Sequence, residues 1–239
     1  MTTAILFAAG KGSRLAPITD TLPKPLVSVQ GATLLERTML HLSPLVDNFI
    51  IVIGYLGDMI QAKIGDTFDG KPVQYQEQLN PKGGTLDAFR TGLQKVKLPN
   101  NTIVMNSDDL HGVELFTLLA EHIDQNPNQP AIGAHKYPHK SRLSQFGIIR
   151  ENQGKFQEIV EKPSQYVSDL VNIGCYYIPY TYHSLIPQSN QVPHQGEEYI
   201  TDFINIVSEK TPMKVIGSHG LWHPVSYPQD IDSAEALSL

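Results

Sequence analysis

The chain has 239 residues, of which 41% are hydrophobic, and this length suits one sizeable domain with a single buried core. Its net charge of -6 argues against a general surface for nucleic acid or acidic membranes. Cys175 is the only cysteine, so no internal disulfide can form. The start carries no positive charge, and its apolar run (residues 4–9) is too short for a signal peptide or a membrane span. We therefore expect one domain over residues 1–239, cytoplasmic, with no membrane or nucleic-acid partner.

The first half of the chain predicts strands that alternate with helices. Its opening apolar run ends in glycine, which is typical of a strand buried on both faces. The expected elements are strands over 4–9, 49–53 and 103–105, and helices over 34–42, from 58, over 86–96 and over 113–123. This alternation predicts a three-layer α/β/α, Rossmann-like fold with a mixed, mainly parallel sheet. Ligands bind such sheets beyond the carboxyl ends of the strands, where residues 10–14 and 106–109 fall.

The second half predicts more strands and fewer helices. Strands are expected over 131–134, 147–150, 156–160, 172–178 and 214–216, with helices over 199–207 and 228–237. Pro228 suits the first position of the last helix. We expect the later strands to extend the sheet and to form a small lobe over its edge.

A glycine-rich loop with a local excess of positive charge follows the first strand. Residues 1–35 contain Lys11, Arg14 and Lys24 against one acidic residue, Asp20. Such an island suits a phosphorylated small molecule better than a polymer, although three basic residues on a solvated loop explain it equally well.

The glycines of this loop favour phosphate binding but do not complete a common dinucleotide motif. At Gly10 and Gly12 the missing side chains allow backbone N–H groups to approach a polyphosphate. The third glycine of the dinucleotide pattern is replaced by Leu15, and no Gly-Lys-Ser/Thr of a P-loop follows. A nicotinamide-dependent oxidoreductase is therefore disfavoured.

The continuation of the loop carries a specific resemblance. It reads Gly10-x-Gly12-x-Arg14-Leu15-x-Pro17-x-Thr19 and then Pro23-Lys24-Pro25-Leu26. Further landmarks follow in order, namely Glu161-Lys162-Pro163, Asn172-Ile173-Gly174 and Glu198-Tyr199-Ile200-Thr201-Asp202. With these motifs the sequence resembles the sugar nucleotidyltransferase (nucleotidyl transferase) family over most of its length. The family includes sugar-1-phosphate uridylyl-, thymidylyl-, cytidylyl- and guanylyltransferases.

The resemblance implies transfer of a nucleotidyl group from a nucleoside triphosphate (NTP) to a sugar 1-phosphate, with Mg2+ as cofactor and pyrophosphate as product. It implies three catalytic residues, Arg14 on the outer phosphates, Lys24 on the α-phosphate and Asp108 on the metal. The backbone of Ala9, Gly10, Gly12 and Ser13 would hold the triphosphate, while Gln78 and Gly83 would face the base. The acceptor would be bound by Gly147, Glu161, Lys162 and Asn172.

The expected base site is ambiguous at one glycine, and the expected metal site departs from the family pattern at two positions. The alignment of Gly83 against Gly84 is ambiguous by one residue, and a plain turn before a helix explains that segment equally well. Ser107 stands where the family commonly has glycine, with Asp109 after Asp108.

The second departure is larger. Many members place an aspartate two residues after a tryptophan near the C-terminus, and the matching residue after Trp222 is Pro224. Proline cannot ligate a metal, and the neighbouring His223 is a poor partner for Mg2+. Either Asp108, phosphates and water hold the ion, or some activity has been lost.

These features leave two other interpretations open. One is a catalytically weak protein that binds nucleotides or sugar phosphates, and Pro224 is its best support. The other is cytidylyl transfer to a non-sugar phosphate such as phosphocholine. The nucleobase, the sugar and the oligomeric state are not encoded in any motif that we recognise.

Overall fold

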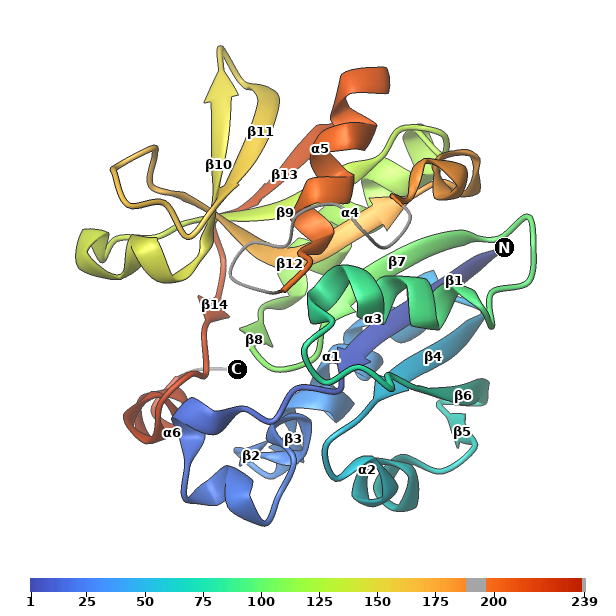
Figure 1. Cartoon of the computed structure of the whole chain (residues 1–239), viewed down its shortest axis with the longest axis vertical. Coiled ribbons are helices and arrows are strands. Elements are labelled where there is room, and N and C mark those ends of the chain that lie inside the picture. Colours follow the sequence, from blue (N-terminus) through green and yellow to red (C-terminus); the bar gives the residue numbers. More distant parts are fainter. Residues whose placement is uncertain (188–196, 238–239) are drawn as a thin grey trace.

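The computed structural model describes residues 1–187 and 197–237. In this part of the chain a 10-stranded sheet forms the centre, and helices cover both of its faces (Figure 1). Its order begins β11-β10-β12-β7-β1-β4-β6-β5, and β9 and β13 branch from β12. None of the described helices is both long and apolar enough to cross a membrane. The mixed, mainly parallel sheet confirms the predicted fold class.

The centre of the sheet is parallel. Strand β1 (Thr2–Ala8) lies between β4 (Asn48–Ile53) and β7 (Asn101–Asn106), and β6 (Lys71–Glu77) lies beyond β4. Burial on both faces explains the continuous apolar runs of these central strands. Since the strands are parallel, their carboxyl ends share one edge, as the sequence predicted.

The two faces of the sheet are covered by different helices. Helices α1, α2 and α4 pack on one face, while α3 and α5 pack on the other, which is the near face in Figure 1. The bounds are α1 Leu34–Leu42, α2 Gly57–Ile64, α3 Gly84–Leu93, α4 Val113–Gln125 and α5 Ile200–Lys210. Apolar side chains of β1 alternate between the two cores, with Leu6 in one and Ile5 in the other.

The sheet forks along β12 (Leu170–Ile178). The second half of this strand pairs antiparallel with β7, whereas its first half pairs with β10 at Val171. On its other side β12 pairs with β9 (Ala131–Lys136), which also pairs with β13 (Lys214–Ser218). The fork falls near Gly174, which has a φ of 68°. At this point β12 therefore changes its neighbour from β10 to β7.

The expected lobe is built on the hairpin of β10 (Gly147–Asn152) and β11 (Lys155–Glu161), which projects beyond the sheet in Figure 1. A short 3-10 helix, η5 (Lys140–Gln145), precedes it. We call η5, β10 and β11 the lobe.

The C-terminal part of the chain returns to the first loop. Strand β14 (Trp222–His223) pairs with β8 (Leu110–His111), and α6 (Pro228–Glu235) follows. The side chain of Gln30, between the short strands β2 (Ser28–Val29) and β3 (Ala32–Thr33), donates to carbonyl groups at the end of α6. A separate apolar cluster joins these segments.

Most predicted elements are present, but β6 was missed. Its sequence, Lys-Pro-Val-Gln-Tyr-Gln-Glu, is largely polar because it lies near the sheet edge and covers less of the core. The short strands β2, β3, β5 (Thr67–Phe68), β8 and β14 were also missed. Helix α3 begins and ends earlier than residues 86–96, because the chain turns into the helix at Gly84.

We predict that Gly174→Ala lowers the free energy of unfolding by about 2–4 kcal/mol, because a methyl group would strain a positive φ and clash with the Asn106 side chain. Urea denaturation measures the change. Gly217→Ala on β13 is the matched control, since nothing lies within 4 Å of its added Cβ. Equal effects at both positions would contradict this view of the fork.

Candidate functional site

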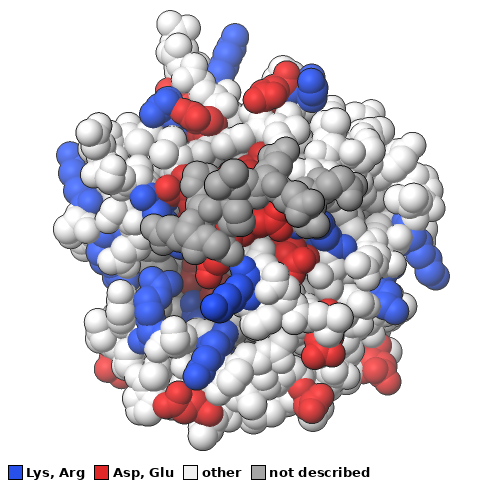
Figure 2. Space-filling model, in the orientation of Figure 1, with Lys and Arg blue, Asp and Glu red and all other residues white. Residues whose placement is uncertain are grey.

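A cavity of ≈ 250 Å³ lies at the shared carboxyl edge of the parallel strands. Its wall combines segments that are far apart in the sequence: Phe7, Ala9, Gly10, Gln78, Pro81, Gly84, Thr85, Ala88, Asn106, Asp108, Glu197 and Tyr199. Figure 2 shows basic and acidic side chains close together around the middle of this face. The sheet thus brings the glycine loop, the end of β7 and the start of α3 to one place.

The loop after β1 is held in a tight turn. Gly12 adopts a left-handed conformation, with φ 64° and ψ 36°, and a Cβ there would lie 2.9 Å from the Cβ of Lys24. The Thr19 hydroxyl donates to the Gly12 carbonyl at 2.9 Å. Leu15 is buried and anchors the loop. A leucine therefore holds this turn where dinucleotide-binding folds use a third glycine.

Lys24 is a buried cation placed between two carboxylates. It begins a short 3-10 helix between Pro23 and Pro25, and its side chain is 8% exposed. Its Nζ lies 2.8 Å from Asp108 and 3.7 Å from Asp109. Burial by itself lowers the pKa of Lys24, but the charges of Asp108 and Asp109 outweigh it and hold that pKa above its usual value. Lys24 therefore stays charged without solvent around it.

The two carboxylates at the end of β7 have different surroundings. Asp108 is 38% exposed and lines the cavity. Asp109 is more buried, and its Oδ1 accepts the Val225 N–H at 3.1 Å. Burial, together with the charge of Asp108, raises the pKa of Asp109 to about 6. Asp109 ties the C-terminal segment to β7, whereas Asp108 is available to a ligand.

Ser107 has a structural task that the sequence did not reveal. Its buried hydroxyl donates to the Phe7 carbonyl at 2.6 Å. This bond joins the ends of β1 and β7 across the sheet, where a glycine would offer no side chain.

The residues partly fit a magnesium ion. The described residues contain no group of three or more His, Cys, Asp or Glu side chains that could hold a metal. Asp108 offers one accessible carboxylate, and Mg2+ commonly uses one or two carboxylates together with water and substrate phosphates. Pro224 lies between His223, which pairs with β8, and Val225, which binds Asp109. The position of the expected second ligand is thus beside the site but has no donor.

The expected base site surrounds the start of α3. Gln78 Nε2 donates to the Gly84 carbonyl at 3.0 Å and to Asp87 Oδ2 at 2.9 Å, which fixes the orientation of its side chain. Gly84, with a φ of 71°, lines the cavity, whereas Gly83 does not. Of the two aligned glycines, Gly84 therefore forms the wall.

The expected acceptor residues converge at the fork of the sheet. Gly147 pairs with Glu161 across the hairpin, and a Cβ on Gly147 would lie 2.9 Å from Glu161 Oε2 and 3.4 Å from Asn172 Nδ2. Lys162 Nζ donates to the Tyr199 hydroxyl at 2.7 Å. Since Tyr199 also lines the cavity, this group adjoins the nucleotide side.

Comparison with known proteins decides the family. The family model described as "Nucleotidyl transferase" matches residues 3–236. The chain belongs to the nucleotidyl transferase family. The resemblance expected from the motifs is thereby confirmed.

Relatives in the nucleotidyl transferase family come from several archaea. The bifunctional protein GlmU of Methanocaldococcus jannaschii is 29% identical over 99% of this chain and 54% of that protein. The UTP–glucose-1-phosphate uridylyltransferase AglF of Haloferax volcanii is 27% identical over 97% of this chain and 94% of that protein. The chain spans about half the length of the GlmU relatives that it matches.

Solved structures of the family share the fold. A UDP-glucose pyrophosphorylase complexed with UDP-glucose superposes with a TM-score of 0.85, at 18% identity, covering 99% of this chain and 97% of that one. A UDP-glucose pyrophosphorylase from Acinetobacter baumannii gives a TM-score of 0.81 at 18% identity, covering 98% and 92%.

Helices α3 and α5 of this family member brace each other at the cavity. The Leu86 N–H donates to the Glu198 carbonyl at 3.0 Å, and the Ile200 N–H donates to the Thr85 hydroxyl at 2.9 Å. An N–H group at the start of each helix, which has no partner within its own helix, therefore finds an acceptor at or just before the start of the other helix. A side chain on Gly84 would clash with the Glu198 carbonyl, so this close contact requires glycine.

Arg90 holds this contact between the helices in place, and no sequence motif distinguishes it from an ordinary charged residue on a helix. Its guanidinium binds both carboxylate oxygens of Glu198, at 2.5 and 3.2 Å. It also donates to the Pro187 carbonyl at 3.0 and 2.8 Å. Arg90 thus attaches both of these residues to α3.

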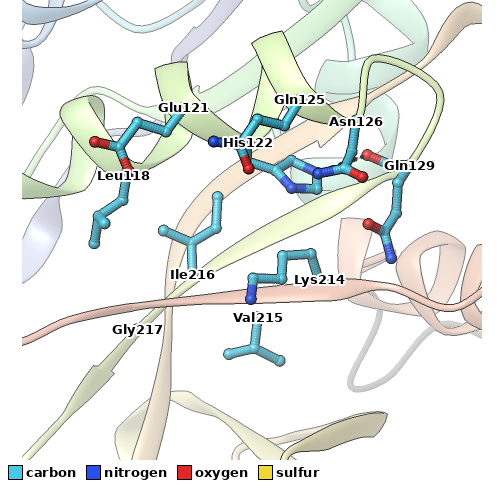
Figure 3. A pocket seen from close by; sticks show the side chains of 10 residues that line it. All are labelled: Leu118, Glu121, His122, Gln125, Asn126, Gln129, Lys214, Val215, Ile216 and Gly217. Carbon is cyan, nitrogen blue, oxygen red and sulfur yellow. Dashed lines mark hydrogen bonds between the residues drawn. The ribbon is translucent and has the colours of Figure 1, made fainter.

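A larger hollow of ≈ 400 Å³ lies between α4 and β13, away from the carboxyl edge (Figure 3). Its side chains come from α4 and the following loop on one side and from β13 on the other. His122 there already bonds with the Gln129 carbonyl at 2.9 Å. This hollow lacks the glycine loop and the buried charges of the cavity, so the cavity is the better candidate site.

We predict that Arg90→Met lowers the free energy of unfolding by about 2–3 kcal/mol, because it leaves the largely buried Glu198 carboxylate without its cation. Arg150→Met is the matched control. The Arg150–Glu158 pair is 49% and 42% exposed, and its loss should cost at most about 0.5 kcal/mol. Urea denaturation of both variants gives the comparison, and equal costs would refute the brace.

Proposed function

We propose that the chain transfers a nucleoside monophosphate from an NTP to a sugar 1-phosphate, forming an NDP-sugar and releasing pyrophosphate. The observation that carries the proposal is the ion pair between the buried Lys24 and Asp108, beside a cavity that is lined by the glycine loop, by Asp108 and by Tyr199, the partner of Lys162. The names of the relatives AglF and UDP-glucose pyrophosphorylase support the substrate class.

The nucleotide half of the reaction rests on the loop and Lys24. Backbone groups at Ala9, Gly10, Gly12 and Ser13 would hold the triphosphate, and Arg14 would bind its outer phosphates. Gln78 and the glycines at the start of α3, Gly83 and Gly84, would hold the base. Lys24 would face the α-phosphate, where negative charge grows as the acceptor attacks in line. Its stiff, desolvated position means that little reorganisation is needed in the transition state.

The same lysine links the phosphate site to the cofactor site. Asp108 would hold Mg2+, which when bound would supply positive charge to stabilise the charge of the phosphates. Lys24 now contacts Asp108, so a bound triphosphate would take over part of this cation's interactions.

The acceptor half rests on the cluster at the fork. Glu161, Asn172 and the backbone at Gly147 would bind sugar hydroxyls, since carboxylate and amide groups pair well with them. Lys162 would hold the acceptor phosphate. Its Nζ lies 4.7 Å from the centroid of the Tyr199 ring, so the ring orients it towards the cavity.

One rival function is supported by a specific observation. With Pro224 in place of a second carboxylate, the protein would bind nucleotides and sugar phosphates with little turnover. The test mixes the protein and Mg2+ with a panel of NTPs and sugar 1-phosphates, measures pyrophosphate and identifies the product by mass spectrometry. Pyrophosphate with an NDP-sugar supports the proposal, whereas binding without release supports the rival. NTP and sugar phosphate substrates also suit a cytoplasmic location, which we include in the proposal.

We predict that Lys24→Met lowers kcat by about 10²–10³-fold while NTP affinity changes only a few-fold, since its contact strengthens in the transition state. Steady-state kinetics and equilibrium titration separate the two quantities. Lys97→Met, at an exposed lysine outside the cavity wall, is the control and should leave kcat nearly unchanged. Equal losses in kcat and NTP affinity would remove Lys24 from the chemical step.

We predict that Pro224→Asp lowers the Mg2+ concentration needed for half-maximal activity, because it restores a carboxylate beside Asp108. Pro224→Asn is the matched control, since it removes the ring without adding charge. The gain should disappear in an Asp108→Asn background. A gain shared by the Asn variant would assign the effect to the proline ring instead, and melting temperatures check that each variant is folded.

A further inference from the structure

Two arginines from distant parts of the chain lie against one tyrosine ring. Arg14, in the loop after β1, has its guanidinium carbon 5.8 Å from the centroid of Tyr227. Arg142, in the lobe, has its guanidinium carbon 5.9 Å from the same centroid. Tyr227 directly precedes α6. Both guanidinium groups therefore lie near one ring, and one of them belongs to the residue that we assign to the outer phosphates.

Arg142 is held only loosely by the protein. Its Nη1 lies 3.4 Å from Asp230 Oδ1, while its Nη2 is buried and has no hydrogen-bond partner. The other oxygen of Asp230 already accepts the N–H groups of Ser226 and Tyr227, at 2.9 and 2.8 Å. A guanidinium has five N–H donors, so most of its binding capacity is unused. Little is lost when it turns towards a stronger acceptor such as a phosphate.

The position of Arg142 also adjoins the acidic end of the site. Burial raises the pKa of the Tyr137 hydroxyl, the charge of Arg142 lowers it, and the charges of Asp230 and Asp109 raise it. The Tyr137 hydroxyl is thus close enough to both Arg142 and Asp109 for their charges to affect its pKa. Arg14 in turn is close enough to Lys24 for its positive charge to lower the pKa of that lysine. Arg142, Arg14 and Lys24 therefore lie around one region of the molecule, where Asp230, Asp108 and Asp109 are their carboxylate neighbours.

We propose that Arg142 is a second arginine for the outer phosphates, which it binds together with Arg14 across Tyr227. This inference rests on the proposed function, because it assigns a residue to the same triphosphate site. Charge on the outer phosphates and on departing pyrophosphate would be shared between two guanidinium groups, one from the loop and one from the lobe. Triphosphate binding would then connect these two parts of the molecule.

The simplest alternative is that Arg142 only ties the lobe to α6 through Asp230. The two roles differ in what they predict for ligands. A purely structural contact would affect the stability of the fold, and its loss would change the affinity for every ligand equally. An outer-phosphate contact would affect pyrophosphate and leave ligands without outer phosphates unchanged.

The test titrates inorganic pyrophosphate, glucose 1-phosphate and UMP, each with Mg2+, against the full chain and its variants by calorimetry. Arg142→Gln should weaken pyrophosphate binding about 10–50-fold and change the other two affinities less than two-fold. Arg142→Lys should recover part of the loss, since it restores the charge but not the fork. Lys140→Gln, at an exposed neighbour in η5, is the matched control and should change nothing.

Three results would overturn the inference. Unchanged pyrophosphate affinity in Arg142→Gln would do so, and so would a loss confined to glucose 1-phosphate, which would assign Arg142 to the acceptor. Matched falls in melting temperature for Arg142→Gln and Asp230→Asn, without a selective loss of pyrophosphate, would make Arg142 a structural tie. Arg14→Gln separates failures: if it too leaves pyrophosphate affinity unchanged, the proposed triphosphate site itself is wrong.

Discussion

The arrangement of the site depends on one constraint, the burial of a lysine between two aspartates. A charge taken out of water is costly unless partners surround it, and here Asp108 and Asp109 do so from 84 and 85 residues further along the chain. To bring them together, β1 and β7 must lie side by side with their ends level, which the register and the Ser107 bond ensure. Asp109 then binds Val225, so the C-terminal segment follows the same constraint. The glycine loop, the strand ends and the last strand are therefore fixed around a single cation.

A second group of contacts joins the two expected substrate subsites. The reciprocal bonds between α3 and α5 place the wall of the base site against Tyr199, which holds Lys162. Arg90 holds this contact through its ion pair with Glu198. A shift of either helix would disturb both expected subsites. Occupation of one subsite should therefore change the affinity at the other through the packed backbone.

Much of this could be predicted from the sequence, and the remainder has physical reasons for being hidden. Fully buried strands such as β1 and β4 show continuous apolar runs, and the opening motif is local, so both were visible. Strand β6 was not, because a polar strand near an edge has no such run. Arg90, Thr85 and Ser107 bind partners that lie 108, 115 and 100 residues away, respectively. No local sequence pattern encodes such pairings. That Gly84, and not Gly83, lines the cavity could not be predicted, because adjacent glycines differ only in backbone geometry and in their neighbours.

The fork in β12 has a consequence for how such a protein can change its substrate. Asn172, beside the lobe, and Cys175, paired with β7, belong to one continuous strand. Because β12 pairs with β9 on both sides of the irregularity at Gly174, the sheet holds the spacing of these two residues more firmly than a loop would. The strand therefore sets the spacing between the proposed acceptor site and the end of β7. Family members with other acceptors should therefore differ in the side chains and loop lengths of the lobe, while the spacing along β12 stays constant.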